Sequence, residues 1–424
     1  MYKYLIICFI GLLIINCTDF TTKHPLPTAI SSYKSFGAND TTYIRLSPDW
    51  DAATVGYSFS QPMDIVIGRD GYIFVADHGN DKVVVLNKSG YIQTNYNNIT
   101  DIEGLLGIDI DSKLNLFIVN GTNRIYYWNQ YLNYAQIDSV IIQYVLRDTV
   151  TDEQFIYTFS ELLQAEDDTT HHLILEDYIL SGEQALVDSL MNVSIFYEDP
   201  SEEAQYMGVA VGPYGKGYIY VTDAGRNRIL KIDIVPNNIV LLKNGWLGYT
   251  YIGEYNRVVA SHGSGAGTVD SPHAITTDEQ GDIYFTQTGG NFLVQKLSYK
   301  DFNSVFTLNE HPIMDLKDPP LFVYPSDVAV DKESFIYVVE KKPYTLIKTN
   351  PDSSVDTTFC YVHKFTPDGR IVDLGNKGIA TAVFQNPQGI AVDDEDIIYI
   401  ANTELNQIER FKLSISDEDL PSEP

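Results

Sequence analysis

One pattern of apolar strands and polar turns occurs six times along this chain of 424 residues. In each copy a first apolar strand, a polar turn, a second apolar strand, a polar loop and a third strand follow one another. The first strands are anchored at Ile65, Ile108, Val209, Ile275, Val328 and Ile390, and the second strands at Ile73, Leu116, Ile219, Ile283, Ile336 and Ile398. A repeat of this size cannot bury its apolar face alone, so adjacent copies must stack against one another.

The composition of each repeat indicates β-structure. The first strands are almost continuously apolar, which is typical of strands buried on both faces. Gly, Asp and Asn fill the turns, as at Arg69-Asp70-Gly71. An aromatic residue follows each second anchor, and aromatic residues favour strands. We therefore predict an all-β fold made of meandering three- or four-stranded sheets.

The repeats resemble the NHL repeat. The similarity is carried by motifs such as Gln61-Pro62-Met63-Asp64-Ile65, Tyr72-Ile73-Phe74-Val75-Ala76-Asp77-His78-Gly79-Asn80 and Asn386-Pro387-Gln388-Gly389-Ile390-Ala391-Val392-Asp393. It covers about residues 42–413, and six copies imply a six-bladed β-propeller of four-stranded blades. The last repeat shows only three strands, whereas residues 42–46 alternate apolar and polar residues. We predict that this N-terminal segment supplies the missing outer strand.

The first residues predict export. Residues 1–16 combine Lys3 with an apolar run too short to span a bilayer, which is typical of a signal peptide. Leu13-Ile14-Ile15-Asn16-Cys17 resembles a loose, Bacteroidetes-type bacterial lipobox, which implies acylation of Cys17; an ordinary signal peptide is the alternative. Residues 17–41 then form a tether, and residues 414–424 form an acidic tail. The resemblance implies a lipoprotein anchored in the bacterial envelope, on the periplasmic or surface face of the outer membrane.

Distances between first anchors locate two insertions, one at about residues 138–205 and a smaller one at about 341–360. Two segments in the larger insertion fit the capping-box signature, Thr151-Asp152-Glu153-Gln154 and Ser181-Gly182-Glu183-Gln184. The first of them precedes an apolar stripe at helical spacing, made of Phe155, Ile156, Phe159, Leu162 and Leu163. We predict that this insertion, after the second blade, is partly helical.

The net charge limits the partners. The chain has 28 basic and 57 acidic residues, a net charge of −29. This excess repels nucleic acids and anionic membrane surfaces, so the acyl anchor is the expected route to the membrane. Of the three cysteines, Cys8 would leave with the signal peptide and Cys17 would be acylated. Cys360 then has no partner, and no disulfide framework is expected.

Propeller connectivity predicts where a ligand would bind. The loops that enter the first strands and the loops between second and third strands lie on one face, together with both insertions. Such a face, open to the central tunnel, is the usual ligand site of this architecture. The candidates at the starts of the first strands are Met63, Leu106, Met207, His273, Ser326 and Gln388, and those in the second loops are Asp77, His78, Asp223, Arg226, Gln287, Glu340 and Asn402.

The sequence does not point to one reaction. The repeats resemble peptidyl-hydroxyglycine lyases, which implies a zinc held by histidines from Pro-His motifs, but only Ser271-Pro272-His273-Ala274-Ile275 fits. His78 and His273 are weak zinc candidates, and Asp77 and Asp223 could hold calcium or serve as turn residues. We assign no catalytic residue and no cofactor, and we expect a protein that is not an enzyme. The favoured interpretation is a binding or scaffolding module for a peptide, glycan or protein. A metal-dependent lyase or lactonase centred on His273 and a structural subunit of an envelope complex are the alternatives.

Overall fold

A computed structural model describes residues 43–165, 172–308, 322, 324–349, 355–370, 372 and 384–413. The described chain divides into two compact units. The propeller unit holds the described residues of Gly37–Tyr134, Met191–Val235 and Ile252–Pro424, and the second unit holds those of Ala135–Leu190 and Pro236–Tyr251. The predicted signal peptide, Cys17, the tether and the acidic tail lie outside the described residues.

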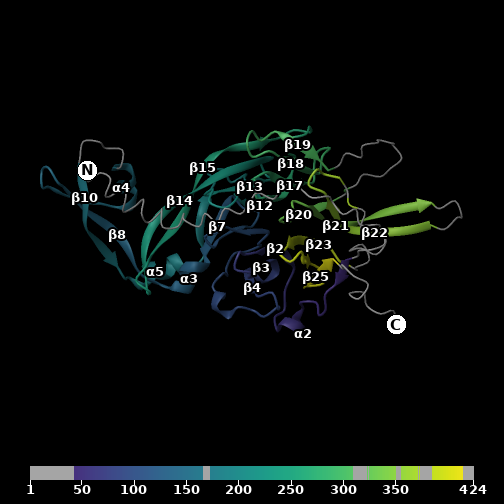
Figure 1. The fold of residues 1–424 in the computed structure, drawn as a ribbon, viewed down its shortest axis with the longest axis horizontal. Coiled ribbons are helices and arrows are strands. Elements are labelled where there is room, and N and C mark those ends of the chain that lie inside the picture. The colour runs from purple at the N-terminus through teal and green to yellow at the C-terminus, as the bar shows by residue number, and fades with distance from the viewer. Residues whose placement is uncertain are drawn as a thin grey trace. The chain divides into compact units, whose positions relative to one another are not determined.

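The propeller unit is an all-β propeller, as the sequence predicts (Figure 1). Its strands pair with antiparallel neighbours and fall into six sheets. From the innermost strand outward, the sheets are β2 (Pro62–Ile67), β3 (Ile73–Asp77) and β4 (Lys82–Leu86); β5 (Gly107–Ile110), β6 (Asn115–Val119), β7 (Arg124–Asn129) and β11 (Ser194–Glu198); β12 (Tyr206–Val211), β13 (Tyr218–Asp223), β14 (Arg228–Leu242) and β15 (Leu247–Ser261); β16 (Pro272–Thr277), β17 (Ile283–Gln287), β18 (Val294–Leu297) and β19 (Ser304–Thr307); β20 (Pro325–Val330), β21 (Ile336–Thr349) and β22 (Val355–Phe365); and β23 (Pro387–Val392), β24 (Ile398–Asn402), β25 (Gln407–Leu413) and β1 (Tyr43–Arg45).

The innermost strands form a closed ring. Contacts run from β2 to β5, β12, β16, β20 and β23 in turn and return from β23 to β2. The N-terminal strand β1 completes the last sheet, because Tyr43 pairs with Leu413 and Arg45 pairs with Phe411. This confirms the prediction that residues 42–46 supply the missing outer strand. The ends of the chain's repeat array are thereby joined by backbone hydrogen bonds.

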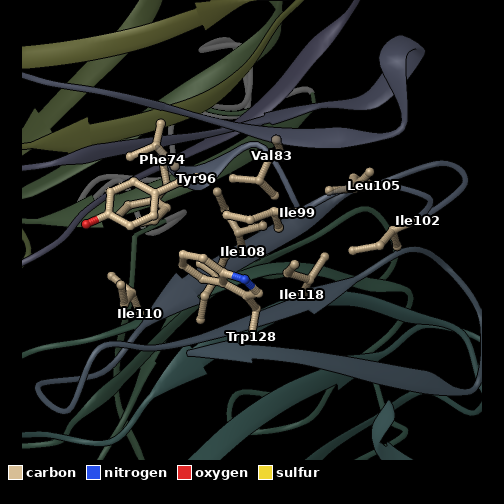
Figure 2. Packing of buried hydrophobic residues seen from close by; sticks show 13 residues of the cluster. Phe74, Val83, Tyr96, Ile99, Ile102, Leu105, Ile108, Ile110, Ile118 and Trp128 are labelled. Atoms are coloured by element: carbon tan, nitrogen blue, oxygen red, sulfur yellow. The ribbon is translucent and has the colours of Figure 1, made fainter. Parts of the chain in front are cut away.

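Buried aromatic and aliphatic side chains fill the space between adjacent sheets. Figure 2 shows one such cluster, which packs side chains of the sheet that begins with β2 against side chains of the sheet that begins with β5. Trp128 is fully buried in it, and its ring meets the ring of Tyr96 edge-on at a centroid distance of 5.6 Å. The continuous apolar first strands thus have the role that their sequence predicts.

A repeated aspartate fixes the turn after the innermost strand. Asp331 Oδ1 accepts hydrogen bonds from the backbone N–H groups of Glu333 and Phe335, and its Oδ2 accepts one from the Tyr337 hydroxyl at 3.0 Å. Equivalent bonds join Asp278 to Tyr284 and Asp393 to Tyr399. The aromatic residue that follows the second anchor therefore both fills the core and holds the preceding turn.

The second unit contains strands and helices. Its elements are β8 (Ile137–Asp148), β9 (Gln154–Tyr157), α4 (Phe159–Ala165), β10 (Leu173–Ser181) and α5 (Gln184–Met191), with parts of β14 and β15 (Leu247–Ser261). Helices follow both capping segments, since α4 begins at Phe159 and α5 begins at Gln184, but Phe155 and Ile156 themselves are not helical, because they pair with β8 as strand β9. The pairing of Phe155 and Ile156 with β8 thus outweighs the helical spacing of their sequence.

The remaining elements are short. They are α2 (Ala52–Val55), α3 (Gln130–Ala135) and the 3-10 turns η1 (His78–Asn80) and η2 (Thr94–Tyr96). The smaller predicted insertion falls on the hairpin of β21 and β22, whose pairing extends to Thr349 and Val355. Within the described ranges, the structure has no helix long and apolar enough to cross a membrane.

We expect the substitution Tyr43→Ala to lower the free energy of unfolding by about 3 kcal/mol, as for other buried aromatic side chains. The Tyr43 side chain is only 7 % exposed and belongs to the core of the last sheet. Urea denaturation followed by circular dichroism measures the change. The adjacent substitution Ile44→Ala is the control, because Ile44 is only partly buried; equal effects of both would contradict a closing role for β1 packing.

Candidate functional site

The innermost strands surround a cavity of about 180 Å³. Its lining comes from β2, β5, β12, β16, β20 and β23, and it includes all six residues that the sequence predicts at the starts of the first strands. They are Met63, Leu106, Met207, His273, Ser326 and Gln388. The ring of strands thus brings together side chains that are more than 300 residues apart in sequence.

The six strand-start residues divide the cavity into two halves. Met63 on β2, Leu106 directly before β5 and Met207 on β12 are apolar. The polar residues lie on β16, β20 and β23, namely His273, Ser326 and Gln388. A ligand that fits this ring needs an apolar side and a hydrogen-bonding side.

Among the residues that the structure describes, His273 is the only one with an imidazole that lines the cavity. Its Nδ1 lies 3.1 Å from the carbonyl oxygen of Ser326, so Nδ1 carries the proton and donates it. Burial lowers the pKa of His273, and the positive charge of Lys341 acts in the same direction, while the bond to Ser326 opposes them. The imidazole is therefore neutral at pH 7, and Nε2 keeps its lone pair.

Three aspartates also line the cavity, namely Asp64, Asp109 and Asp327. The sequence did not identify them as candidate site residues. Each uses one carboxylate oxygen for the next residue of its own strand and the other for an adjacent innermost strand. Asp64 Oδ2 accepts from the N–H of Ile108 at 2.7 Å, Asp109 Oδ2 from that of Val211 at 2.7 Å, and Asp327 Oδ2 from that of Ile390 at 2.8 Å. These side chains link β2 to β5, β5 to β12 and β20 to β23.

Burial makes these carboxyl groups hard to ionise. Desolvation raises the pKa of Asp64 and of Asp109 to about 7, although backbone N–H groups that bond to the carboxylates oppose the change. Desolvation also raises the pKa of Asp327 well above its usual value, and the negative charges of Asp64 and Asp109 raise it further. In three of the six first strands an aspartate lies directly beside the anchor residue, next to Ile65, Ile108 or Val328, and this was the available sequence signal.

Close approach of the innermost strands explains two glycines of the repeat. A Cβ atom at Gly208 would lie 2.6 Å from the carbonyl oxygen of His273, and one at Gly389 would lie 2.7 Å from that of Met63. The Thr222 hydroxyl donates to the same His273 carbonyl at 2.5 Å. These contacts fix the backbone on both sides of the cavity ring.

The candidates between second and third strands have a different role. Asp77, Asp223, Gln287, Glu340 and Asn402 each accept a hydrogen bond from a backbone N–H in the loop that leads to the innermost strand. The donors are Ser60, Gln205, Asp270, Tyr324 and Gln385. All five acceptor side chains are buried, and none lines the cavity. This geometry is that of turn residues.

His78 and Arg226 also lie away from the cavity lining. His78 Nδ1 lies 2.8 Å from the carbonyl oxygen of Leu105, whereas His273 bonds to Ser326. Arg226 Nη1 lies 3.5 Å from Asp199 Oδ1. The structure therefore does not bring His78 to the imidazole of His273 in this cavity.

The residues described offer one group of three potential metal ligands with mutually close atoms. It consists of Asp331, Glu333 and Asp396, whose ligand atoms lie within 4.8 Å of one another. None of the three lines the cavity. Lys332 lies 3.8 Å from Glu333 and 3.9 Å from Asp396, so a basic side chain already partly balances these charges.

The chain was compared with known families and proteins. No family model matches it. A probable peptidyl-α-hydroxyglycine α-amidating lyase of Caenorhabditis elegans is 25 % identical over 161 residues, which are 37 % of this chain and 41 % of that protein. The chain thus matches less than half of the length of that relative.

Solved structures resemble the fold at low identity. They include a streptogramin B lyase (12 % identity, TM-score 0.40, 90 % of this chain and all of that one), a gluconolactonase of Xanthomonas campestris (10 %, 0.45, 90 % and 99 %) and an auxiliary nutrient-binding protein of Bacteroides thetaiotaomicron (12 %, 0.41, 84 % and 70 %). At these TM-scores the resemblances carry no argument about function.

We expect Asp223→Ala to lower the free energy of unfolding by about 3 kcal/mol, because it removes one partner of a buried ion pair. Asp223 Oδ2 accepts from Arg228 Nε at 2.7 Å, and Asp223 Oδ1 accepts from the N–H of Gln205. Asp394→Ala, at an exposed ion pair with Lys88, should cost below about 1 kcal/mol. A rise in the wild-type melting temperature on adding calcium, lost in Asp223→Ala, would instead indicate a calcium site there.

We expect the free energy of unfolding to rise as the pH falls from 8 to 5.5. The pKa of Asp109 is about 7 in the folded protein and about 3.9 in an unfolded chain, so the folded state binds the proton more tightly. The charged groups that act on Asp109 are Asp64 and Asp111. Asp109→Asn should flatten this pH dependence, as measured by urea denaturation at several pH values. An unchanged slope in the variant would contradict a buried, protonatable Asp109.

Proposed function

We propose that this protein is a binding module whose ligand enters the central cavity of the propeller unit. The convergence of the six strand-start residues on one cavity carries this proposal. The apolar half suits a hydrocarbon part of a ligand, and the polar half suits hydroxyl, amide or carbonyl groups. A cavity of about 180 Å³ holds a side chain or part of a sugar ring. The ligand would therefore be a peptide, a glycan or an exposed segment of a protein.

The proposal also covers the cellular location and the domain organisation of the protein. Cys17 would carry the acyl chains of a bacterial envelope lipoprotein, with residues 1–16 as signal peptide and 17–41 as tether. The six sheets and the closed ring of innermost strands support a six-bladed propeller over residues 42–413. The second unit would be an insertion in the repeat array, with bounds near Ala135–Leu190 rather than 138–205.

Thermal shift measurements with short peptides and oligosaccharides test the binding role. We expect a ligand that raises the melting temperature of the wild type to have no effect on Met207→Trp, because the larger side chain fills the apolar half of the cavity. Tyr91→Ala, at a side chain that is 70 % exposed and does not line the cavity, is the control. A ligand that stabilises Met207→Trp as strongly as the wild type would exclude the cavity as its site.

A metal-dependent lyase or lactonase is the second candidate. The neutral imidazole of His273 in the cavity favours it, since Nε2 could bind a metal ion such as zinc. Catalytic zinc sites use about three protein ligands, and the cavity lining holds one imidazole. The carboxylates of Asp64, Asp109 and Asp327 already accept backbone hydrogen bonds. We therefore place this candidate behind binding.

Metal analysis by mass spectrometry separates the two candidates. Near-stoichiometric zinc in the wild type that is lost in His273→Ala would favour the lyase or lactonase. The control His78→Ala should leave the metal content unchanged, because His78 does not line the cavity. Metal-free protein that still binds a peptide or glycan would favour the binding module.

A further inference from the structure

The second unit exposes many large apolar side chains to solvent. The most exposed are Val150 at 72 % and Trp246 at 71 %. The others in this unit are Ile142, Ile156, Leu175, Tyr178, Ile179, Leu180 and Leu247. Exposed apolar side chains that gather in one small unit indicate a surface that another molecule covers.

Strand β10 is the part of this surface with the most unusual geometry. It is nine residues long, and among the described strands it pairs with β8 alone, from Leu173 opposite Asp148 to Ser181 opposite Val140. Its consecutive residues Tyr178, Ile179 and Leu180 are each about two-fifths exposed. Successive side chains of a strand point to opposite faces, so both faces of β10 and its outer edge are accessible.

An accessible, apolar edge strand is a template for another strand. Its outer N–H and C=O groups can bond to the backbone of an extended segment, and its side chains supply contacts on both faces. Native sheets usually protect such an edge with a lysine, a proline or a bulge. The sequence of β10 is Leu-Ile-Leu-Glu-Asp-Tyr-Ile-Leu-Ser, with register shifts against β8 but neither a basic residue nor a proline.

The charge of the second unit indicates what kind of segment would pair with this edge. Residues 135–190 and 236–251 contain twelve acidic side chains and two basic ones, Arg147 and Lys243. Arg147 already lies 3.0 Å from Asp152 and 3.7 Å from Glu176. Asp177, near the middle of β10, is exposed, and its Oδ1 accepts the N–H of Tyr178 at 2.8 Å. The edge is therefore both apolar and negatively charged.

We propose that β10 takes up an extended, lysine- or arginine-bearing segment of a partner protein as an additional strand. This inference deepens the proposed binding role but uses a surface of the second unit, so it does not depend on a ligand in the cavity. The partner backbone would continue the sheet beyond β10. Its apolar side chains would cover Leu175, Ile179 and Leu180, and its basic side chains would lie beside Asp177.

The acidic excess argues against other occupants. Two copies of the second unit would each bring a net charge of −10 to a shared interface. Anionic lipid surfaces and nucleic acids would be repelled for the same reason. A basic polypeptide is the occupant that gains from both the charge and the unpaired strand edge.

The test uses the full chain and a ten-residue peptide in which lysine and valine alternate. Fluorescence anisotropy of the labelled peptide at about 0.15 M salt, where the Debye length is about 8 Å, measures binding. We expect saturable binding, and no binding of the matched peptide in which glutamate replaces lysine. A lysine-valine peptide with N-methyl groups along one edge should bind at least about fivefold more weakly, because it cannot form the strand hydrogen bonds.

Two charge reversals locate the site. Asp177→Lys should weaken peptide binding at least about fivefold, whereas Asp188→Lys, on helix α5 of the same unit, should change it less than about twofold. Both variants alter the net charge equally, and both residues are exposed. Circular dichroism confirms that each variant is folded, and Asp177→Asn replaces Asp177→Lys if the latter does not fold.

Three outcomes would overturn the inference. Equal weakening by Asp177→Lys and Asp188→Lys would mean attraction by net charge without a site. Undiminished binding of the N-methylated peptide would exclude strand addition. Concentration-dependent dimers in sedimentation that Asp177→Asn strengthens would identify a second copy as the occupant.

Peptide binding that persists in Met207→Trp would keep this inference separate from the cavity proposal.

Discussion

The approach of six innermost strands that belong to six different sheets is the constraint on which the propeller depends. In the described part of the chain no shared β-ladder joins these strands, so side chains make the connections. Carboxylates link β2 to β5, β5 to β12 and β20 to β23, and the Nδ1 of His273 links β16 to β20. Thr222 binds the His273 carbonyl, and Thr403 binds the Pro62 carbonyl at 2.7 Å across the closing junction. Glycines allow the strands to come close enough for these bonds.

The same bonds shape the cavity. A carboxylate that must reach an adjacent strand near the axis is removed from bulk water, so Asp64, Asp109 and Asp327 become hard to ionise. The polar half of the cavity is also structural, since Ser326 and His273 hold adjacent strands. The side chains that line the cavity therefore also hold adjacent innermost strands together. What remains for a ligand is the lone pair of His273 Nε2, the Gln388 amide, whose Nε2 already donates to Asn386, and the apolar half of the cavity.

The second unit differs from the propeller in how it treats the edge of its sheet. The propeller satisfies its strand edges by ring closure and by the pairing of β1 with β25. The second unit leaves β10 at the edge of its sheet, with two acidic residues and register shifts against β8 but without the lysine or proline that often protects such an edge. An edge strand of this kind has a cost in solubility, which the strong negative charge of the unit offsets. The two units thus present two kinds of surface, a polar and apolar cavity and an acidic, apolar strand.

The sequence by itself determined the repeat, the β-strands, the closing strand and the six residues at the cavity ring. The repeat period and the alternation of side chains along a strand are local properties of the sequence, and each of the six repeats has the same ones. It did not determine which polar residues face a ligand. Asp77 and Asp223 look like ligand residues in sequence, yet their carboxylates hold loop N–H groups. Asp64 and Asp327 look like strand residues, yet they line the cavity. Only the tertiary structure decided this, because the bonds at issue join residues of different sheets, and their distances depend on how closely the strands pack around the axis.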